Sequence, residues 1–321
     1  MPTTTPATAK RIQYHRYGGP DVLRFEDFEP PAPGPGEVLV RVRAAGANPM
    51  DRKIRVGEMK MITGRDFPMG VGYDFAGVVA AVGPGVTRLA AGDEVLGGAP
   101  LKRGGAFAEL VLAEESGVVR KPAGLSFEDA AVLPTVGITA YQALFTKAGL
   151  RPGQAVFVHG CLGGVGRAAL QLAAAHGISL AGSCRPTAAD EARALGADPV
   201  VGFTFDPAPL RGRFDLVLDT AGTLPYKAAR TLIRSGGRIV DINPTPVKLA
   251  RGALPGPYQV LIAKAVTEDL DAVARAAGEG ALRLPIGARA ALPEAVAALT
   301  ALERDAAPGS GKFVVTVEQH G

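Results

Sequence analysis

The stretch that decides the fold is Val156–Gly166, VFVHGCLGGVG, in which an apolar run enters a turn of small residues. The segment Arg167–His176 follows at once and has the composition of a helix. In dinucleotide folds, a glycine in such a turn lets the backbone approach a pyrophosphate, and a later glycine lets the helix pack closely on the strand. Free amides at the start of the helix then face the anion. The order strand, turn, helix predicts a nucleotide site formed by Gly160, Gly163, Gly164, Val165 and Gly166.

The same stretch allows a second interpretation, a tight turn that binds no ligand. A G-x-G-x-x-G pattern laid over residues 161–166 has Cys161 in its first position instead of glycine. The flanking pattern favours the nucleotide site, because further apolar strands alternate with helices along this part of the chain. The predicted strands are Ala155–His159, Ile178–Gly182, Phe214–Leu218 and Arg238–Ile242, and the predicted helices include Arg167–His176 and Ala188–Leu195. This pattern predicts a parallel sheet covered on both faces.

The first third of the chain has a different pattern, with short strands between Gly/Pro-rich turns. Glu37–Ala44 alternates valines with charged residues, and Gly77–Val82, Glu94–Leu96 and Ala106–Leu112 are further short strands. Such a series is typical of a compact barrel. Alternation returns in Lys312–Val317, which predicts that the end of the chain rejoins this first domain.

The boundary between these two patterns lies near Ser126, where a capping box of the S-x-x-[DE] type opens an alanine-rich helix ending near Pro134. Further helices are predicted over Asp269–Ala277 and Ala291–Leu302. We therefore predict one domain over residues 10–126 and 266–321, and a nucleotide domain over 127–265. A length of 321 residues agrees with roughly two domains.

Composition excludes several classes of protein. Two cysteines in 321 residues are too few for a disulfide scaffold or a multi-cysteine zinc module. No run of apolar residues is long enough to span a membrane, and the first ten residues lack the apolar core of a signal peptide, so a cytoplasmic location is expected. The net charge of +4 is spread along the chain without a basic cluster, which argues against a nucleic-acid partner.

The choice of cofactor depends on the residues after the second strand of the nucleotide domain. An acid that binds the ribose is expected about 20 residues beyond the glycines. This region contains Ser183 and Arg185 and has no acid before Asp190. A hydroxyl and a guanidinium suit a 2′-phosphate, so the sequence predicts NADPH. The alternative is that Arg185 is only a solvated loop charge.

Taken together, these motifs make the chain resemble the medium-chain dehydrogenase/reductase superfamily, in its zinc-independent quinone oxidoreductase branch. The resemblance covers about Arg11 to Val317, and it implies an α/β protein in which a Rossmann doubly wound parallel sheet is inserted in a GroES-like β-barrel catalytic domain. It also implies a homodimer that acts on a small-molecule quinone or α,β-unsaturated carbonyl. The motifs that carry it are Tyr17–Leu23 (YGGPDVL), Ala44–Asp51 (AAGANPMD), Gly72–Val79 (GYDFAGVV), Gly92–Val95 (GDEV), Gly105–Glu109 (GAFAE), Leu133–Tyr141 (LPTVGITAY), Phe214–Thr220 (FDLVLDT), Gly236–Ile239 (GGRI) and Gly311–Phe313 (GKF).

The chain departs from the zinc-using members of this superfamily at the metal ligands. Where those relatives carry a thiolate and a Gly-His-Glu segment, this chain has Asn48, Tyr73 and Asp74. An amide and a phenol are poor zinc ligands beside Cys and His, so no metal is expected. Without a Lewis acid, reduction of an activated acceptor is more feasible than oxidation of a simple alcohol.

The resemblance also implies roles for single residues near the nicotinamide. Asn48 and Tyr73 are expected to hold the carbonyl of the acceptor and to stabilise the developing anion. The alternatives are a loop-capping amide for Asn48 and a core aromatic residue for Tyr73. Thr139 and Asn243 correspond to positions beside the nicotinamide ring, although Thr139 can instead bond its own helix backbone. Asp51 is expected to organise its loop, and His159 to support the turn structurally.

Two further departures limit the analogy. Relatives often carry Lys within the stretch corresponding to Pro186–Ala189, and Ser at the position of Leu162. A second possible function, from another class, is a non-catalytic NADPH-binding protein of the crystallin or sensor type. A zinc alcohol dehydrogenase is a third.

Overall fold

The structure, a computed structural model, describes residues 8–304 and 311–318. The expectation about the first ten residues therefore falls mostly outside the described part. The described residues form two compact units. Unit 1 comprises the chain up to Thr135, Ala265–Gly278 and the chain from Leu284 onward, and unit 2 comprises Val136–Lys264 and Glu279–Arg283. The domain division at 126/127 and 265/266 stays a prediction beside this division by compactness.

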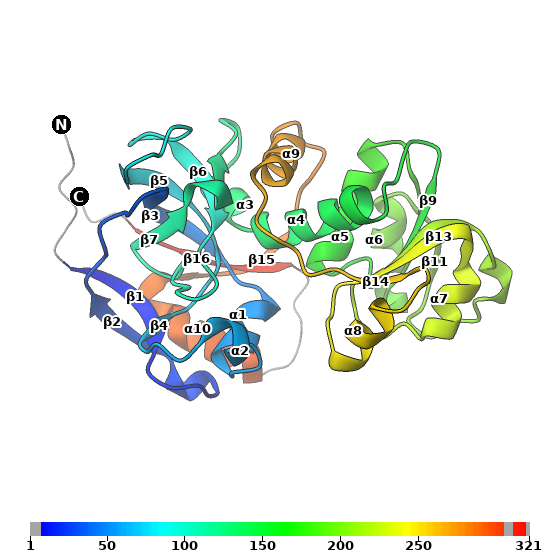
Figure 1. Cartoon of the computed structure of the whole chain (residues 1–321), viewed down its shortest axis with the longest axis horizontal. Coiled ribbons are helices and arrows are strands. Elements are labelled where there is room, and N and C mark those ends of the chain that lie inside the picture. Colours follow the sequence, from blue (N-terminus) through cyan, green and yellow to red (C-terminus); the bar gives the residue numbers. More distant parts are fainter. Residues whose placement is uncertain (1–7, 305–310, 319–321) are drawn as a thin grey trace. The chain divides into compact units, whose positions relative to one another are not determined.

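Unit 1 is built on a seven-stranded sheet and a three-stranded sheet (Figure 1). In the larger sheet the strands follow the order β15 (Ile286–Ala291), β16 (Lys312–Thr316), β3 (Glu37–Gly46), β5 (Asp74–Val82), β6 (Glu94–Gly98) and β8 (Val118–Arg120), and β7 (Leu110–Glu114) also pairs with β3. The smaller sheet has the order β2 (Arg24–Phe28), β1 (Ala9–Tyr14) and β4 (Met69–Gly70).

The central strand β3 forms because its valines pack into the main core of unit 1. Val38, Val40 and Val42 are fully buried in that core. The opposite face was predicted to be charged, but Leu39 on that face is also buried, in a second small cluster with Leu110 and Leu112 on β7 and Ala9 on β1. The strand is thus covered on both sides over its first half, because Leu39 packs with Leu110 and Leu112 of β7, its neighbour in the sheet, and with Ala9 of β1.

The end of the described chain returns to this sheet, as predicted. Strand β16 runs antiparallel to β3, with Val314 opposite Gly46 and Thr316 opposite Ala44. It also runs parallel to β15. Its buried Val314 and Val315 therefore join the last residues of the sequence to the first domain.

Unit 2 is a six-stranded, wholly parallel sheet, which confirms the predicted Rossmann-type architecture (Figure 1). Its order is β11 (Ala197–Val201), β10 (Ser179–Ser183), β9 (Ala155–His159), β12 (Phe214–Asp219), β13 (Ile233–Asp241) and β14 (Tyr258–Val260). Helices α5 (Gly164–Ala175), α6 (Ala189–Ala194), α7 (Tyr226–Leu232) and α8 (Pro246–Gly252) pack on it. The order reverses between β9 and β12, and ligands of such sheets bind outside the carboxyl ends of the strands at this point.

Helix boundaries differ from the predictions in two places. Ser126 accepts the predicted capping bond from the Asp129 amide, at 3.0 Å, but α3 (Phe127–Ala131) ends before Pro134, which instead begins α4 (Pro134–Tyr141). A π-helical turn (Gln142–Lys147) continues α4. The helix expected over Ala291–Leu302 begins only at Ala295, as α10 (Ala295–Arg304), because β15 extends to Ala291. The other helices are α1 (Pro49–Arg55), α2 (Lys60–Thr63) and α9 (Thr267–Gly278).

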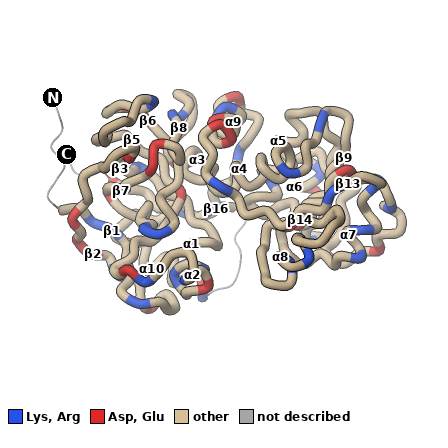
Figure 2. The backbone as a smooth tube through the Cα atoms, viewed as in Figure 1, with Lys and Arg blue, Asp and Glu red and all other residues tan. Residues whose placement is uncertain are grey.

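Residues of both charge signs are interspersed along the described chain (Figure 2). Among the helices that the structure describes, none is both long and apolar enough to cross a membrane.

Candidate functional site

The glycine turn of unit 2 is fixed by backbone contacts. Gly160 has φ of 81°, in the left-handed region that favours glycine. Its amide donates to the Ser183 carbonyl at 3.1 Å, and its carbonyl accepts from the Gly163 amide at 3.1 Å. A Cβ at position 166 would lie 2.3 Å from the Gly160 oxygen, so Gly166 is required for α5 to begin this close to the turn.

The first turn of α5 presents its amides without protein acceptors. Within the described residues no group accepts a hydrogen bond from the amides of Gly164, Val165 or Gly166. Gly163 is exposed, and the only atom close to a Cβ built there is the Gly160 oxygen at 3.5 Å. A methyl group at this position would therefore occupy open space above the amides, which is the space that a phosphate needs. The turn thus fits the pyrophosphate of a dinucleotide.

The two residues expected to bind a 2′-phosphate differ in their surroundings. The Ser183 hydroxyl is fully buried and contacts His159 Nδ1 at 2.6 Å, so it faces the turn and not solvent. Arg185 is exposed, and no described carboxylate pairs with it. The neighbouring arginines are occupied, because Arg167 pairs with Glu191 at 2.7 Å and Arg193 with Asp190 at 2.6 Å.

Asn243 follows β13 and is linked to the glycine turn through Thr220, which lies in the loop after β12. Its Nδ2 donates to the Thr220 carbonyl at 3.0 Å. Thr220 Oγ1 in turn donates to the Gly160 carbonyl at 3.0 Å. Gly160, Ser183 and Asn243 are thus brought together at the carboxyl edge of the sheet. Thr139 lies on α4, where its side chain is almost completely buried.

In unit 1, Asn48 stands at the start of α1 as its N-cap residue. The backbone amide of Asn48 donates to Asp51 Oδ2 at 2.7 Å. The two residues form a capping box. Asp51 therefore organises its own loop, as expected. Burial raises the pKa of the Asp51 carboxyl to about 7.

The Asn48 side chain is fully engaged inside unit 1. Its Nδ2 donates to Asp74 Oδ2 at 2.8 Å, and its Oδ1 accepts from Lys312 Nζ at 2.6 Å. Lys312 also donates to the Ala47 carbonyl at 2.7 Å. The amide therefore links a carboxylate to an ammonium group and has little hydrogen-bonding capacity left for a ligand.

Asp74 is the buried centre of this network. It is fully inaccessible to solvent, and Thr135 donates to it from both its hydroxyl, at 2.6 Å, and its backbone amide, at 3.1 Å. Burial raises the pKa of Asp74 and lowers the pKa of Lys312, and the opposite charge of each residue partly offsets the shift of the other. A buried carboxylate is retained when it is paired and hydrogen-bonded in this way.

Tyr73, next to Asp74, has the contrasting environment. Its ring packs on Gly98 of β6, where a Cβ would come within 2.4 Å of the ring. No group in the described part of the chain bonds to its hydroxyl, which is therefore available to a ligand. Burial raises the pKa of the Tyr73 phenol to about 12, with smaller contributions from Asp74 and Glu114, so the hydroxyl is a proton-bearing donor at neutral pH.

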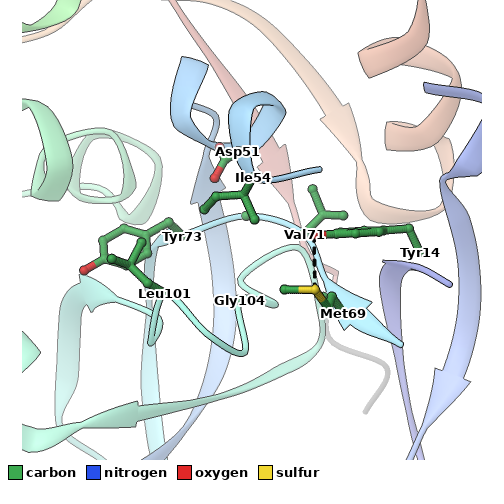
Figure 3. Close-up of a pocket in the computed structure, with 10 residues that line it drawn as sticks. Tyr14, Asp51, Ile54, Met69, Val71, Tyr73, Leu101 and Gly104 are labelled. Carbon is green, nitrogen blue, oxygen red and sulfur yellow. Dashed lines mark hydrogen bonds between the residues drawn. The ribbon is translucent and has the colours of Figure 1, made fainter. Parts of the chain in front are cut away.

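A small cavity lies beside Tyr73 and Asp51 (Figure 3). Its volume is about 10 Å³, which is room for a single water molecule and far below the volume of a quinone. Figure 3 shows Asp51 and Ile54 approaching it from α1, and Tyr14 opposite them with its hydroxyl bonded to Met69 Sδ at 3.6 Å. The cavity is thus a gap in the core of unit 1 and is too small for a substrate.

The donor set at the positions of the zinc ligands does not fit a zinc ion. Asn48 is held by Asp74 and Lys312, and the ammonium group of Lys312 would repel a cation. In the described part of the chain, no group of three or more His, Cys, Asp or Glu side chains could hold a metal ion.

Sequence reasoning missed Lys312 and Thr135 as partners of Asn48 and Asp74. Lys312 is 264 residues from Asn48 in the sequence, so no local spacing connects them. Each residue lies in a motif of the family resemblance, Lys312 in Gly311–Phe313 and Thr135 in Leu133–Tyr141. These motifs were the sequence signal that could have indicated the two residues.

Comparisons with known proteins agree with this architecture. The model of the alcohol dehydrogenase GroES-like domain matches residues 34–123, and the model named zinc-binding dehydrogenase matches residues 195–315. The chain is 37% identical to a quinone oxidoreductase of Pseudomonas aeruginosa over 73% of each chain. It belongs to the medium-chain dehydrogenase/reductase superfamily, in the quinone oxidoreductase branch.

Two further relatives illustrate the range of this superfamily. The solved structure of the quinone oxidoreductase from Coxiella burnetii superposes with a TM-score of 0.85 at 30% identity, covering 97% of this chain and all of that one. A 2-methylene-furan-3-one reductase of Solanum lycopersicum is 37% identical over 74% of this chain and 63% of its own length. The protein is thus an oxidoreductase of a superfamily whose members use a nicotinamide cofactor.

Proposed function

We propose that this protein is an NADPH-dependent, zinc-independent reductase that transfers hydride to a quinone or an α,β-unsaturated carbonyl. The observation that carries the proposal is the state of Tyr73, a protonated phenol whose hydroxyl has no partner among the described residues, at a position where the resemblance implies a metal ligand in the zinc-using relatives. The names of the relatives from Pseudomonas aeruginosa and Solanum lycopersicum, a quinone oxidoreductase and an enone reductase, agree with this class of acceptor.

In this proposal the chain's own residues bind and orient, and the dinucleotide supplies the hydride. The amides at the start of α5 would hold the pyrophosphate, and Thr139 and Asn243 would contact the nicotinamide end, as the resemblance implies. Tyr73 donates a hydrogen bond to the carbonyl oxygen of the acceptor, which gains negative charge as the hydride is transferred. Asn48 acts less directly, since its amide bonds to Lys312 and to Asp74, the residue that follows Tyr73.

The preference for NADPH rests on Arg185. It is the arginine after β10 that no described carboxylate neutralises, whereas Arg167 and Arg193 are paired. A guanidinium binds phosphate through two parallel hydrogen bonds, and no acid at the end of β10 repels the phosphate. Ser183 supports the glycine turn from its buried side, because its hydroxyl bonds to His159 and to the Gly160 amide.

The decisive experiment measures oxidation of NADPH and of NADH by the full-length protein with a simple quinone and a simple enone. We expect turnover with NADPH, a strong preference over NADH, and a loss of that preference of about tenfold or more in Arg185→Gln, because a charge-assisted hydrogen bond is lost. Tight NADPH binding with no turnover on any acceptor would instead identify a non-catalytic NADPH-binding protein. Activity lost to a chelator and restored by zinc would refute the metal-free mechanism.

Two finer points follow from the resemblance and belong to the same proposal. We infer a homodimer, which light scattering on the purified protein would test. We also infer a cytoplasmic location, which imaging of the tagged protein in its own cells would test.

A further inference from the structure

His159 is buried at the end of β9, directly before the glycine turn, and has a defined partner on each side. Its Nδ1 lies 2.6 Å from Ser183 Oγ at the end of β10, and its Nε2 lies 2.9 Å from Thr223 Oγ1 in the loop after β12. The ring is fully buried and meets Phe203 edge-on, with centroids 5.2 Å apart. One imidazole thus connects the ends of the two strands that flank β9.

The bond to Ser183 continues into the turn. The Gly160 amide donates to Ser183 Oγ at 3.3 Å as well as to the Ser183 carbonyl at 3.1 Å. A hydroxyl that accepts from this amide keeps its own proton for a second acceptor, and Nδ1 of a neutral imidazole is that acceptor. The proton of the ring then lies on Nε2 and points to Thr223. Both ring nitrogens of His159 and the Ser183 hydroxyl therefore have hydrogen-bond partners within this set of residues.

This series of hydrogen bonds also fixes the position of the amides at the start of α5. The Gly160 carbonyl accepts from the Gly163 amide and from Thr220 Oγ1, and it lies against the start of α5, where Gly166 leaves no room for a side chain. A rotation of the Gly160 peptide would therefore move the turn and the first residues of the helix together. Contacts of this outer kind commonly control how well an inner set of groups binds its ligand.

We propose that His159 is a positioning residue for the dinucleotide, which acts by holding the Ser183 hydroxyl against the Gly160 amide. This inference rests on the proposed function, since it assumes that a dinucleotide binds at the turn. It assigns Ser183 to the support of the turn, and it gives the bond to Thr223 a secondary role, because Thr223 is exposed and water can replace it.

Two substitutions of His159 separate its two nitrogen atoms. An Asn side chain places its amide near the position of Nδ1, and a Gln side chain reaches the position of Nε2. We expect His159→Asn to bind NADPH within about twofold of wild type, while His159→Gln and Ser183→Ala bind about tenfold more weakly, the effect of one buried hydrogen bond. The double variant of His159→Gln and Ser183→Ala should bind no more weakly than either single variant, because both changes remove the same bond.

The readout is NADPH fluorescence on binding, together with hydrogen exchange of the Gly160 amide in the protein without cofactor. Exchange at Gly160 should accelerate in His159→Gln and Ser183→Ala and stay at the wild-type rate in His159→Asn. Thr223→Ala and His176→Asn are the controls. His176 is an exposed histidine at the far end of α5, and its Nδ1 lies 2.7 Å from the Leu172 carbonyl.

The two proposals fail in distinguishable ways. If the wild-type protein binds neither NADPH nor NADH, the proposed function is wrong, and the exchange of the Gly160 amide still tests the chain of hydrogen bonds. If both substitutions of His159 weaken binding equally and Ser183→Ala has no effect, the histidine only fills space and the inference is wrong. Thermal unfolding of each variant shows whether it is folded, and Ser183→Ala tests the chain without altering the ring.

Discussion

The Tyr73 phenol and the Asn48 amide differ in what each can still offer a ligand. Asn48 makes hydrogen bonds to Asp74 and Lys312, whereas the Tyr73 hydroxyl has no partner in the described part of the chain. Replacing Asn48 removes hydrogen bonds inside the core of unit 1. Replacing the Tyr73 hydroxyl removes only its proposed hydrogen bond to the substrate. The two expected catalytic residues therefore predict different consequences of substitution.

We expect Tyr73→Phe to lower kcat by about a hundred- to a thousandfold, the range for loss of one donor to a developing oxyanion. The free energy of unfolding should change by less than about 0.5 kcal/mol, because no protein hydrogen bond is lost. Steady-state kinetics with a quinone and chemical denaturation measure the two quantities.

Tyr17→Phe is the matched control for this substitution. The Tyr17 hydroxyl bonds to the Gly64 carbonyl and to Thr63 Oγ1, so its loss should lower stability by about 1 kcal/mol and leave kcat unchanged. Equal kinetic constants for wild type and Tyr73→Phe would show that Tyr73 does not hold the acceptor.

His159 predicts a pH dependence of stability. Burial lowers the pKa of its imidazole from 6.5 to about 4. Asp219, the register partner of His159 on β12, accepts from the amides of Gly222 and Leu224. Between these pKa values the unfolded chain binds a proton that the native ring does not, so the free energy of unfolding rises with pH in this window. The contribution is about 3 kcal/mol, present above pH 6.5 and lost toward pH 4.

Denaturant unfolding of wild type and His159→Asn at several pH values between 4 and 7 isolates this contribution, because the other titrating groups are common to both proteins. The wild-type curve should be the steeper one. Parallel curves would mean that the buried ring takes up a proton as readily as the unfolded chain does.

For single residues, the sequence indicated which residues belong to the candidate site better than it indicated what each of them contacts. The motif Ala44–Asp51 indicated Asn48 and Asp51, and the capping geometry of Asp51 agrees with the expected loop role. The position of Lys312 beside Asn48 was not predictable, because it depends on the pairing of strands from opposite ends of the chain.

At the scale of elements, the glycine turn and α5 depend on two glycines in different ways. A Cβ on Gly166 would lie 2.3 Å from the Gly160 oxygen, a backbone atom that cannot move aside. A Cβ on Gly163 would meet only the same oxygen, at 3.5 Å, and the φ of Gly163 is an ordinary −69°. One glycine is thus required by packing, and the other leaves space for a ligand.

We expect Gly166→Ala to lower the free energy of unfolding by about 1–3 kcal/mol, the usual cost of overpacking. Gly163→Ala should cost less than about 1 kcal/mol as a change at a helix N-cap, yet it should weaken NADPH binding strongly, because the methyl group enters the phosphate space. Thermal unfolding and fluorescence titration of both variants measure the contrast. Similar binding by Gly163→Ala and wild type would place the pyrophosphate elsewhere.

Elements with strong apolar periodicity were predictable, and those without it were not. The buried strands β9 and β12 follow from their runs of Val, Leu and Phe, and β10 (SLAGS) follows from Ile178 and Leu180 at its start. Strand β15 (IGARAA) consists mainly of small residues and has no alternation that indicates a strand, and its pairing with β16 makes it one. Such pairing is a tertiary effect that a local pattern does not contain.

At the scale of the whole molecule, the two units differ in how the sequence builds them. All six strands of unit 2 come from one continuous stretch of the chain, so its contacts are comparatively local. The large sheet of unit 1 needs β16, which arrives from the end of the sequence to lie between β15 and β3. Composition and length predicted two domains, but the closure of the first domain followed only from alternation in Lys312–Val317 and from the resemblance.

This difference predicts that a chain ending at Arg304 loses unit 1 and keeps unit 2. The truncation removes Phe313, Val314 and Val315, which are buried in the core of unit 1. Each such side chain contributes about 1.5–3 kcal/mol on burial, so the sum is comparable to the whole stability of a domain. It also removes the ammonium group of Lys312 from the network around Asp74. Hydrogen exchange should show protection lost in β3 and β5 and retained in β9, β10 and β12.

Full-length Lys312→Met is the control, since it removes the charge and keeps the strand, and it should preserve the protection of β3. A truncated chain with wild-type protection in β3 would show that the sheet of unit 1 closes without its last strand.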